Sequence, residues 1–118
     1  TLMEQHELEL LRVPNLGEAA RAAGLSWMHL PIQDVSVPTQ EFERHWPEAA
    51  AQIERELRAG RNVVIHCRGG LGRTGLIAGM LLVEHGVKPA EALQAVRMVR
   101  PGAVETGEQK RYLINHGS

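Results

Sequence analysis

Apolar side chains recur at helical spacing over much of this chain. Over residues 39–59 they fall three and four positions apart, which predicts an amphipathic helix that Pro47 breaks or kinks. Leu93, Val96 and Val99 are expected to face inward from a later helix that begins with Pro89 at its first position. Further helices are predicted at 4–13, 15–24, 74–84 and 103–115, where prolines, glycines and capping residues set their ends.

Two short segments interrupt the helical pattern. Ser26–Leu30 and Val63–Ile65 are typical of strands, and they alternate with the helices. This order predicts an α/β fold, with a mostly parallel central sheet flanked by helices. A length of 118 residues suits a single domain, 1–118. Because Thr1-Leu2-Met3 looks like the tail of a strand, we expect an N-terminal strand segment to be missing before it.

Charge and composition narrow the range of functions. Residues 1–60 carry ten acidic and five basic side chains, whereas residues 61–118 carry four acidic and eight basic ones. This balance falls short of a nucleic-acid-binding pattern, while the positive half favours an anionic substrate. No apolar run is long enough to predict a membrane span. The single cysteine, Cys67, cannot form an internal disulfide, so we expect a reducing, cytoplasmic location.

The segment Asn62–Gly75 carries the candidate chemistry, in the order strand, tight loop and helix. Glycines at 69, 70 and 72 allow backbone N–H groups to converge on one anion. A helix that starts near Thr74 adds unpaired N–H groups and the positive end of its dipole. Cys67 lies at the edge of this cradle, so we expect its thiol pKa to be lowered and the thiolate to act as a nucleophile. Arg73 can bind two phosphate oxygens with its planar guanidinium.

The sequence argues against two other phosphate-binding motifs in this loop. Gly70–Gly75 fits G-x-G-x-x-G, but a dinucleotide site needs a second strand and an acidic residue about 20 positions later. That region, 90–97, is instead typical of a helix. A Walker loop needs a lysine before Thr74, and this chain has none there. The six histidines show no zinc-like spacing, so the sequence predicts no metal and no cofactor.

The string HCRGGLGRTG, from His66 to Gly75, resembles the signature loop of the cysteine-dependent protein phosphatases. It is most similar to their dual-specificity branch, in particular the kinase-associated phosphatase (cyclin-dependent kinase inhibitor 3) type. The resemblance implies a protein-tyrosine-phosphatase-like fold in which Cys67 attacks phosphorus, Arg73 binds the phosphoryl oxygens and Thr74 assists departure of the thiolate. The resemblance also implies that five further residues of the loop bind the substrate: Arg68, Gly69, Gly70, Leu71 and Gly72.

Three supporting residues complete the expected site. Asp34 is the only ionisable residue of the loop 31–38, and a carboxylic acid there can protonate a leaving oxygen, although it can equally form a local turn. The resemblance favours Asp34 as the general acid. It also implies that His66 helps to fix the loop. Gln109 is implied to orient the hydrolytic water, yet Thr106-x-x-Gln109 is also a capping box, and both interpretations stay open.

We therefore predict a phosphoprotein phosphatase that acts on phosphotyrosine, and on phosphoserine or phosphothreonine, through a phosphocysteine intermediate. Its partner would be a phosphorylated protein, with no nucleic acid or membrane involved and the oligomeric state left open. Arg68 at the pocket rim makes a phosphoinositide or another small phosphate monoester the second candidate substrate. The sequence also leaves open a pseudophosphatase that only binds phosphopeptides, and a rhodanese-like sulfurtransferase, although the cysteine loop of a sulfurtransferase is usually one residue shorter.

Overall fold

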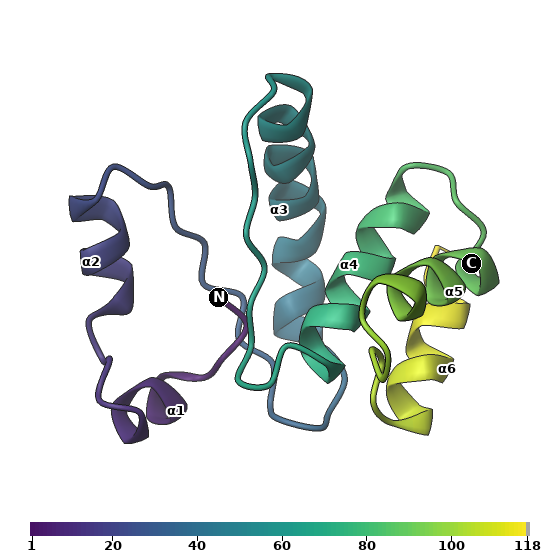
Figure 1. The fold of residues 1–118 in the computed structure, drawn as a ribbon, viewed down its shortest axis with the longest axis horizontal. Coiled ribbons are helices and arrows are strands. Elements are labelled where there is room, and N and C mark those ends of the chain that lie inside the picture. Colours follow the sequence, from purple (N-terminus) through teal and green to yellow (C-terminus); the bar gives the residue numbers. More distant parts are fainter. Residues whose placement is uncertain (118) are drawn as a thin grey trace.

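The computed structural model describes residues 1–117, which form helices joined by turns and extended segments (Figure 1). Figure 1 shows α3 in the middle of the molecule, with α1 and α2 on one side and the remaining helices on the other. No helix in the described range is long and apolar enough to cross a membrane. The helices are α1 (Gln5–Leu10), α2 (Leu16–Ala22), α3 (Gln40–Arg58), α4 (Gly72–Glu84), α5 (Pro89–Val99) and α6 (Gly107–Asn115).

The hydrophobic core is centred on α4. Its residues Leu76, Ile77 and Met80 are at most 1% exposed, and they belong to one cluster with residues of α3, α5 and α6. Helices α5 and α6 pack against α4 and against each other. Complete burial of an aliphatic side chain contributes about 1.5–3 kcal/mol to folding. The first turn of α4 follows the cysteine loop directly, so this core holds the loop in place.

Two expectations about the helices need correction. Pro47 does not break α3, which runs through it from Gln40 to Arg58. The proline removes one backbone N–H donor, but buried side chains on both sides of it, including Trp46 and Ile53, keep the two halves against the core. Val99 is 87% exposed rather than inward-facing. Each three-residue step along an α-helix falls about 60° short of a full turn, so Val99 has rotated away from the stripe that begins at Leu93.

The expected central sheet is not confirmed, because residues 1–117 contain no regular strand. Segments without regular secondary structure, drawn as extended ribbons in Figure 1, take the place of the strands: 1–3, 26–33 and 61–67. Thr1 donates its terminal N–H to Met28 and accepts from the N–H of Leu30, both at 2.9 Å. Leu2 donates to the carbonyl of His66 at 3.0 Å. Leu2 also accepts from the N–H of Ile32 at 2.9 Å. These few bonds do not form a regular ladder, since only Thr1 and Leu2 bridge the two longer segments.

Candidate active site

The loop between the extended segment 61–67 and α4 is held from two sides. The carbonyl of Leu71 accepts hydrogen bonds from the backbone N–H groups of Gly75, at 3.0 Å, and Val104, at 3.2 Å. Val104 is buried and belongs to the connection between α5 and α6. A Cβ atom on Gly75 would lie 2.8 Å from the Val104 nitrogen, so only glycine allows this close approach. The loop that carries Cys67 is therefore fixed by packing at the start of α4.

The three glycines of the loop differ in backbone conformation and in the space around them. Gly70 has a φ of +71°, a left-handed conformation that favours glycine. A Cβ atom on Gly72 would lie 2.9 Å from a carboxylate oxygen of Glu105 and 3.0 Å from the side-chain oxygen of Gln109. A Cβ atom on Gly69 would meet nothing within 4 Å. The backbone conformation thus favours glycine at position 70. At position 72 a Cβ atom would press on the buried amide of Gln109, whereas at position 69 there is room for one.

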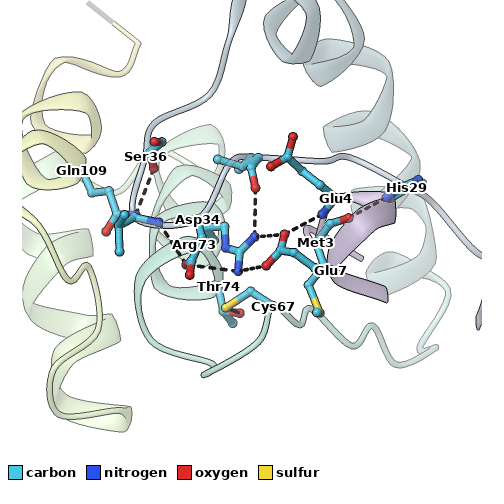
Figure 2. Close-up of polar contacts among 12 residues, drawn as sticks. Met3, Glu4, Glu7, His29, Asp34, Ser36, Cys67, Arg73, Thr74 and Gln109 are labelled. Carbon is cyan, nitrogen blue, oxygen red and sulfur yellow. Dashed lines mark hydrogen bonds and ion pairs between the residues drawn. The ribbon is translucent and has the colours of Figure 1, made fainter. Parts of the chain in front are cut away.

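Cys67 is half-buried, and its sulfur accepts a hydrogen bond from the Thr74 hydroxyl at 2.9 Å (Figure 2). Burial is the largest single influence on the thiol and raises its pKa. Hydrogen bonds from the Thr74 hydroxyl and from the backbone N–H groups of Thr74 and Gly70, together with the charge of Arg73, outweigh burial and lower the pKa of Cys67 below its ordinary value. These contacts favour a thiolate at the mouth of the loop.

We expect alkylation of Cys67 by iodoacetamide to titrate with a midpoint below about 8.5, the pKa of a free cysteine. The rate should rise with pH through this midpoint, because only the thiolate reacts. Thr74→Ala removes the hydroxyl donor, so the midpoint should move upward by about one pH unit. Thr74→Ser should restore the low midpoint, and Ser36→Ala serves as a matched hydroxyl deletion outside the loop. A midpoint that stays in place in Thr74→Ala would contradict this account of the thiol.

Arg73 is 2% exposed, and three groups hold its guanidinium (Figure 2). Nη1 and Nη2 donate to the two carboxylate oxygens of Glu7, at 2.7 Å and 2.9 Å, in a bidentate pair. Nη1 also donates to the carbonyl of Ile32 at 2.9 Å, and Nη2 lies 3.2 Å from a carboxylate oxygen of Asp34. Burial opposes the charge, but the hydrogen bonds and charge of Glu7 raise the pKa of Arg73 above its usual range. The guanidinium is thus preorganised beside Cys67.

Glu7 is a site residue that sequence reasoning missed, because no local motif around it indicates a role in the site. Its side chain is buried and also accepts from the N–H of Glu4 at 2.8 Å, as part of a capping box at the start of α1. The hydrogen bond from Arg73 lowers the pKa of Glu7, so the carboxylate is ionised. No spacing rule connects residues 7 and 73, and the available signal was only that a buried arginine requires an acidic partner.

Asp34 lies where the sequence placed it, on the loop before α3 and next to Arg73 (Figure 2). Its side chain is 57% exposed. The same oxygen that faces Arg73 accepts the N–H of Val35 at 3.0 Å, so the local turn is also present. Val35 has a φ of +52°, which is rare for a β-branched residue and marks a strained turn. The structure therefore brings Asp34, Arg73 and Cys67 together at one site.

Gln109 is fully buried, and its contacts confirm the capping box. Its side-chain oxygen accepts from the N–H groups of Glu105 and Thr106, at 3.0 Å and 3.2 Å, and the hydroxyl of Thr106 accepts the N–H of Gln109. The amide nitrogen of Gln109 donates to the carbonyl of Ser36 at 3.0 Å (Figure 2). The side chain therefore ties the start of α6 to the loop of Asp34, while a role in orienting water stays a prediction.

His66 and Arg68 are the neighbours of Cys67 in the chain. Among the described contacts, neither side chain touches its sulfur. The ring nitrogen Nε2 of His66 lies 2.7 Å from the hydroxyl of Thr1, which also accepts from the indole N–H of Trp27. Burial and the nearby amino terminus lower the pKa of His66, so its ring is neutral near pH 7. Arg68 is exposed beside the loop, as expected. Arg100, which sequence reasoning missed, donates to the carbonyl of Gly69 at 3.2 Å.

Within the described range, no three histidine, cysteine, aspartate or glutamate side chains gather in a group that could hold a metal ion. The charged side chains of the site are paired with one another instead, as Glu7 and Asp34 are with Arg73. The arrangement supplies a nucleophile, a fixed cation, converging N–H groups and a nearby carboxyl group. These are the parts that transfer of a phosphoryl group to sulfur requires.

Curated proteins related to this chain include tyrosine phosphatases. Cyclin-dependent kinase inhibitor 3 of Rattus norvegicus is 36% identical over 110 residues, which cover 91% of this chain and 50% of that protein. Tyrosine-protein phosphatase CDC14 of Candida albicans is 38% identical over 86 residues, or 72% of this chain and 15% of that protein. The chain spans about half the length of the cyclin-dependent kinase inhibitor 3 relatives that it matches.

Solved structures are also similar to this chain over most of its length. Kinase associated phosphatase, crystallised with its catalytic site cysteine substituted by serine, matches with a TM-score of 0.84 at 32% identity, over 95% of this chain and 63% of that one. Tk-PTP in its active form matches with a TM-score of 0.79 at 39% identity, over 95% of this chain and 71% of that one. The fold is therefore that of the protein-tyrosine-phosphatase-like enzymes, although residues 1–117 form no regular strands.

A protein-family model gives the assignment directly. It is described as "Polymorphic toxin system, DSP-PTPase phosphatase" and matches residues 1–87. This range is well over half of the chain and includes Glu7, Asp34, Cys67 and Arg73, whereas Gln109 lies beyond it. The chain belongs to the DSP-PTPase phosphatase family, the dual-specificity-type cysteine-dependent protein tyrosine phosphatases.

Proposed function

We propose that this chain hydrolyses phosphate monoesters of phosphorylated proteins, on tyrosine and on serine or threonine, through a phosphocysteine intermediate. The observation that carries the proposal is the environment of Cys67. Its sulfur accepts a hydrogen bond from Thr74 in a loop whose contacts lower the thiol pKa, with the buried cation Arg73 beside it. A thiolate held next to a fixed cation is suited to attack the phosphorus of a phosphate ester.

In the first step, Cys67 Sγ attacks phosphorus, so that an S–P bond forms while the ester P–O bond breaks. Asp34 donates its proton to the departing oxygen, which leaves as an alcohol. In the free protein Asp34 pairs with Nη2 of Arg73. An incoming phosphate competes for this donor and frees Asp34 to carry a proton. Glu7 holds the other edge of the guanidinium, so Arg73 keeps its orientation during the exchange.

In the second step, water attacks phosphorus and the S–P bond breaks. The Asp34 carboxylate accepts the proton of the attacking water, which returns the acid for the next cycle. The electron pair of the S–P bond stays on sulfur, where the hydroxyl of Thr74, 2.9 Å away, stabilises the departing thiolate. The products are inorganic phosphate and the thiolate of Cys67. Cys67 and Asp34, together with water, thus account for every bond formed or broken and every proton transferred in the two steps.

Aryl phosphates with different leaving groups test the role of Asp34. We expect the wild-type chain to hydrolyse p-nitrophenyl phosphate and phenyl phosphate without added metal. Asp34→Asn should slow phenyl phosphate by about 10²–10⁴-fold, the usual contribution of general acid catalysis. The loss should be smaller for p-nitrophenyl phosphate, because its leaving oxygen needs little protonation. Steady-state kinetics across the series measures this dependence.

Gln33→Ala is the matched control, because Gln33 is the exposed neighbour of Asp34 in the same loop. Its rates should stay close to the wild type. Equal losses for both leaving groups in Asp34→Asn would mean that Asp34 acts on binding or loop structure rather than as a proton donor. A folded wild-type chain without turnover would instead favour a pseudophosphatase that only binds phosphopeptides.

A polyanionic small molecule is the second candidate substrate, and the exposed arginines at the loop support it. Arg68 is exposed, and Arg100 lies against Gly69, so both cations flank the mouth of the loop. Arginine clusters of this kind bind additional phosphate groups. We expect a phosphoinositide headgroup to compete with p-nitrophenyl phosphate more weakly in Arg68→Ala and Arg100→Ala. Inhibition constants that are unchanged in both variants would leave the phosphoprotein as the favoured substrate.

A further inference from the structure

Gln109 is a fully buried polar residue of α6 that touches two parts of the site. On one side its amide packs on Gly72, the first residue of α4. A Cβ atom there would lie 3.0 Å from the amide oxygen and 3.2 Å from the amide nitrogen. On the other side, Nε2 donates to the carbonyl of Ser36 at 3.0 Å (Figure 2). The side chain thus connects the start of α4 with residues 31–38, which we call the acid loop because they carry Asp34.

The hydrogen bonds around the Gln109 amide determine which end is oxygen and which is nitrogen. The oxygen accepts from the backbone N–H groups of Glu105 and Thr106, at 3.0 Å and 3.2 Å. In the opposite orientation, an NH₂ group would face these two donors and the oxygen would face the Ser36 carbonyl. A carbonyl oxygen has two lone pairs, so the two bonds occupy both of them. The amide therefore offers its N–H to the acid loop, and its oxygen is already used within the protein.

Asp34 lies in a tight turn that ends at Ser36. The N–H of Ser36 donates to the carbonyl of Gln33 at 3.1 Å, and the N–H of Val35 donates to the Asp34 carboxylate at 3.0 Å. Val35 has a φ of +52°, a conformation that a β-branched residue keeps only where its surroundings hold it. A hydrogen bond to the Ser36 carbonyl therefore restrains the whole turn, including Asp34.

Hydrogen bonds hold the acid loop on both sides of Asp34. Before it, the carbonyl of Ile32 accepts from Nη1 of Arg73 at 2.9 Å. After it, the carbonyl of Ser36 accepts from Gln109. The Asp34 carboxylate itself lies 3.2 Å from Nη2 of Arg73, and in the proposed mechanism a phosphate group takes this donor. The bond from Gln109 does not involve the substrate, so it stays in place when the contact between Asp34 and Arg73 is lost.

We propose that Gln109 is a positioning residue for the general acid, and that its bond to the Ser36 carbonyl keeps Asp34 within reach of the leaving oxygen. The inference rests on the proposed role of Asp34 and extends it to a buried residue that does not touch the substrate. An acid that is free to move away from the leaving oxygen transfers its proton less often, so restraint of the turn raises the rate of the first step.

Two substitutions of Gln109 and one control in the same capping box separate the cap from the bond to the acid loop. Gln109→Glu keeps an acceptor for the N–H groups of Glu105 and Thr106 but replaces the donor to Ser36 with a carboxylate oxygen. Gln109→Met removes both functions without adding charge. Thr106→Ala removes the hydroxyl that accepts the N–H of Gln109 at 3.0 Å, and it leaves the bond to Ser36 in place.

The readout is the ratio of kcat/KM for p-nitrophenyl phosphate to kcat/KM for phenyl phosphate. Both esters carry the same phosphate group, so effects of charge or of reduced stability cancel in the ratio. We expect the ratio to rise by about tenfold or more in both Gln109 variants, as part of the roughly 10²–10⁴-fold contribution of general acid catalysis. Thr106→Ala should leave the ratio unchanged. In Asp34→Asn, a further Gln109→Met substitution should not change the ratio, because Gln109 acts through the missing acid.

Hydrogen exchange tests the same bond without turnover. The amides of Val35 and Ser36 bond within the turn, so they should exchange at least about fivefold faster in both Gln109 variants. Thr106→Ala should leave their rates unchanged. The comparison can also be made in Cys67→Ser. A folded wild-type chain without turnover would refute the proposed function, and the exchange rates would still decide whether Gln109 holds the acid loop.

Each outcome supports or overturns the proposal. A raised ratio that is absent in the Asp34→Asn background, together with faster exchange of the turn, supports it. A lower kcat with unchanged kcat/KM would assign Gln109 to hydrolysis of the phosphocysteine, as expected for a residue that orients water, and would overturn the proposal. Unchanged exchange, or a change in the ratio that Thr106→Ala shares, would overturn it as well.

Discussion

Cys67→Ser is expected to lower kcat/KM for p-nitrophenyl phosphate by at least about a thousandfold, because the variant loses the nucleophile of the covalent step. A serine hydroxyl is not ionised near neutral pH, and the contacts that stabilise a thiolate do not replace a general base. The structure provides Cys67 with Thr74, Gly70 and Arg73 but with no such base in contact with its sulfur among the described hydrogen bonds. Initial-rate measurements without added metal give the comparison.

A rapid acid quench sharpens this test. Mass spectrometry of the wild type should find a phosphoryl group on the peptide that contains Cys67, and the peptide of Cys67→Ser should carry none. The variant should keep the circular dichroism spectrum and Tm of the wild type, because serine fills the same space and still accepts from Thr74. Full activity in a folded Cys67→Ser variant would show that another group attacks phosphorus.

Glu7→Ala is expected to lower the free energy of unfolding by about 3–5 kcal/mol, since it leaves the buried charge of Arg73 without its bidentate partner. Activity should fall as well, because Arg73 is then no longer held in the orientation in which it binds the incoming phosphate. Urea denaturation measures the first effect and kcat/KM the second. Glu9→Ala is a matched control, because Glu9 is exposed on the same short helix α1. Similar losses in both variants would contradict the assigned pair.

The pH dependence of stability gives an independent measure of the same ion pair. The hydrogen bond from Arg73 lowers the pKa of Glu7 in the folded chain. The stabilisation is therefore complete above the pKa of an unfolded glutamate, about 4.3, and it is lost as pH falls through the lower folded-state value. The isosteric variant Glu7→Gln cannot titrate, so its free energy of unfolding should change less than that of the wild type over this acidic range.

Local patterns were sufficient to predict most of the helices and the nucleophile loop. Helix α3 was expected over 39–59 and spans Gln40–Arg58, and α4 was expected over 74–84 and spans Gly72–Glu84. The capping box of Thr106 and Gln109 is confirmed. These features depend on side chains within one or two turns of each other, or on the conformational freedom of a glycine such as Gly70.

Long-range contacts were less accessible to sequence reasoning. Asp34 and Arg73 are far apart in the chain, and only the family resemblance indicated that they belong to one site. In the structure their side chains form an ion pair at 3.2 Å. The contact of Gln109 with the Ser36 carbonyl was not expected at all. The sheet was predicted from two apolar segments, but strands also need partners, and residues 1–117 provide only Thr1 and Leu2 between them.

The sequence by itself determined the nucleophile loop around Cys67, the cation Arg73 and the positions of the helices, because each follows from residues close together in the chain. Only the tertiary structure decided that Glu7 is the partner of Arg73 and that the side chain of Gln109 binds the Ser36 carbonyl in the loop of Asp34. The physical reason is that a buried charge must be neutralised by whichever acidic group packing brings near it, and a buried amide must bond to whichever polar group packing brings near it. Hydrophobic periodicity carries no information about either choice.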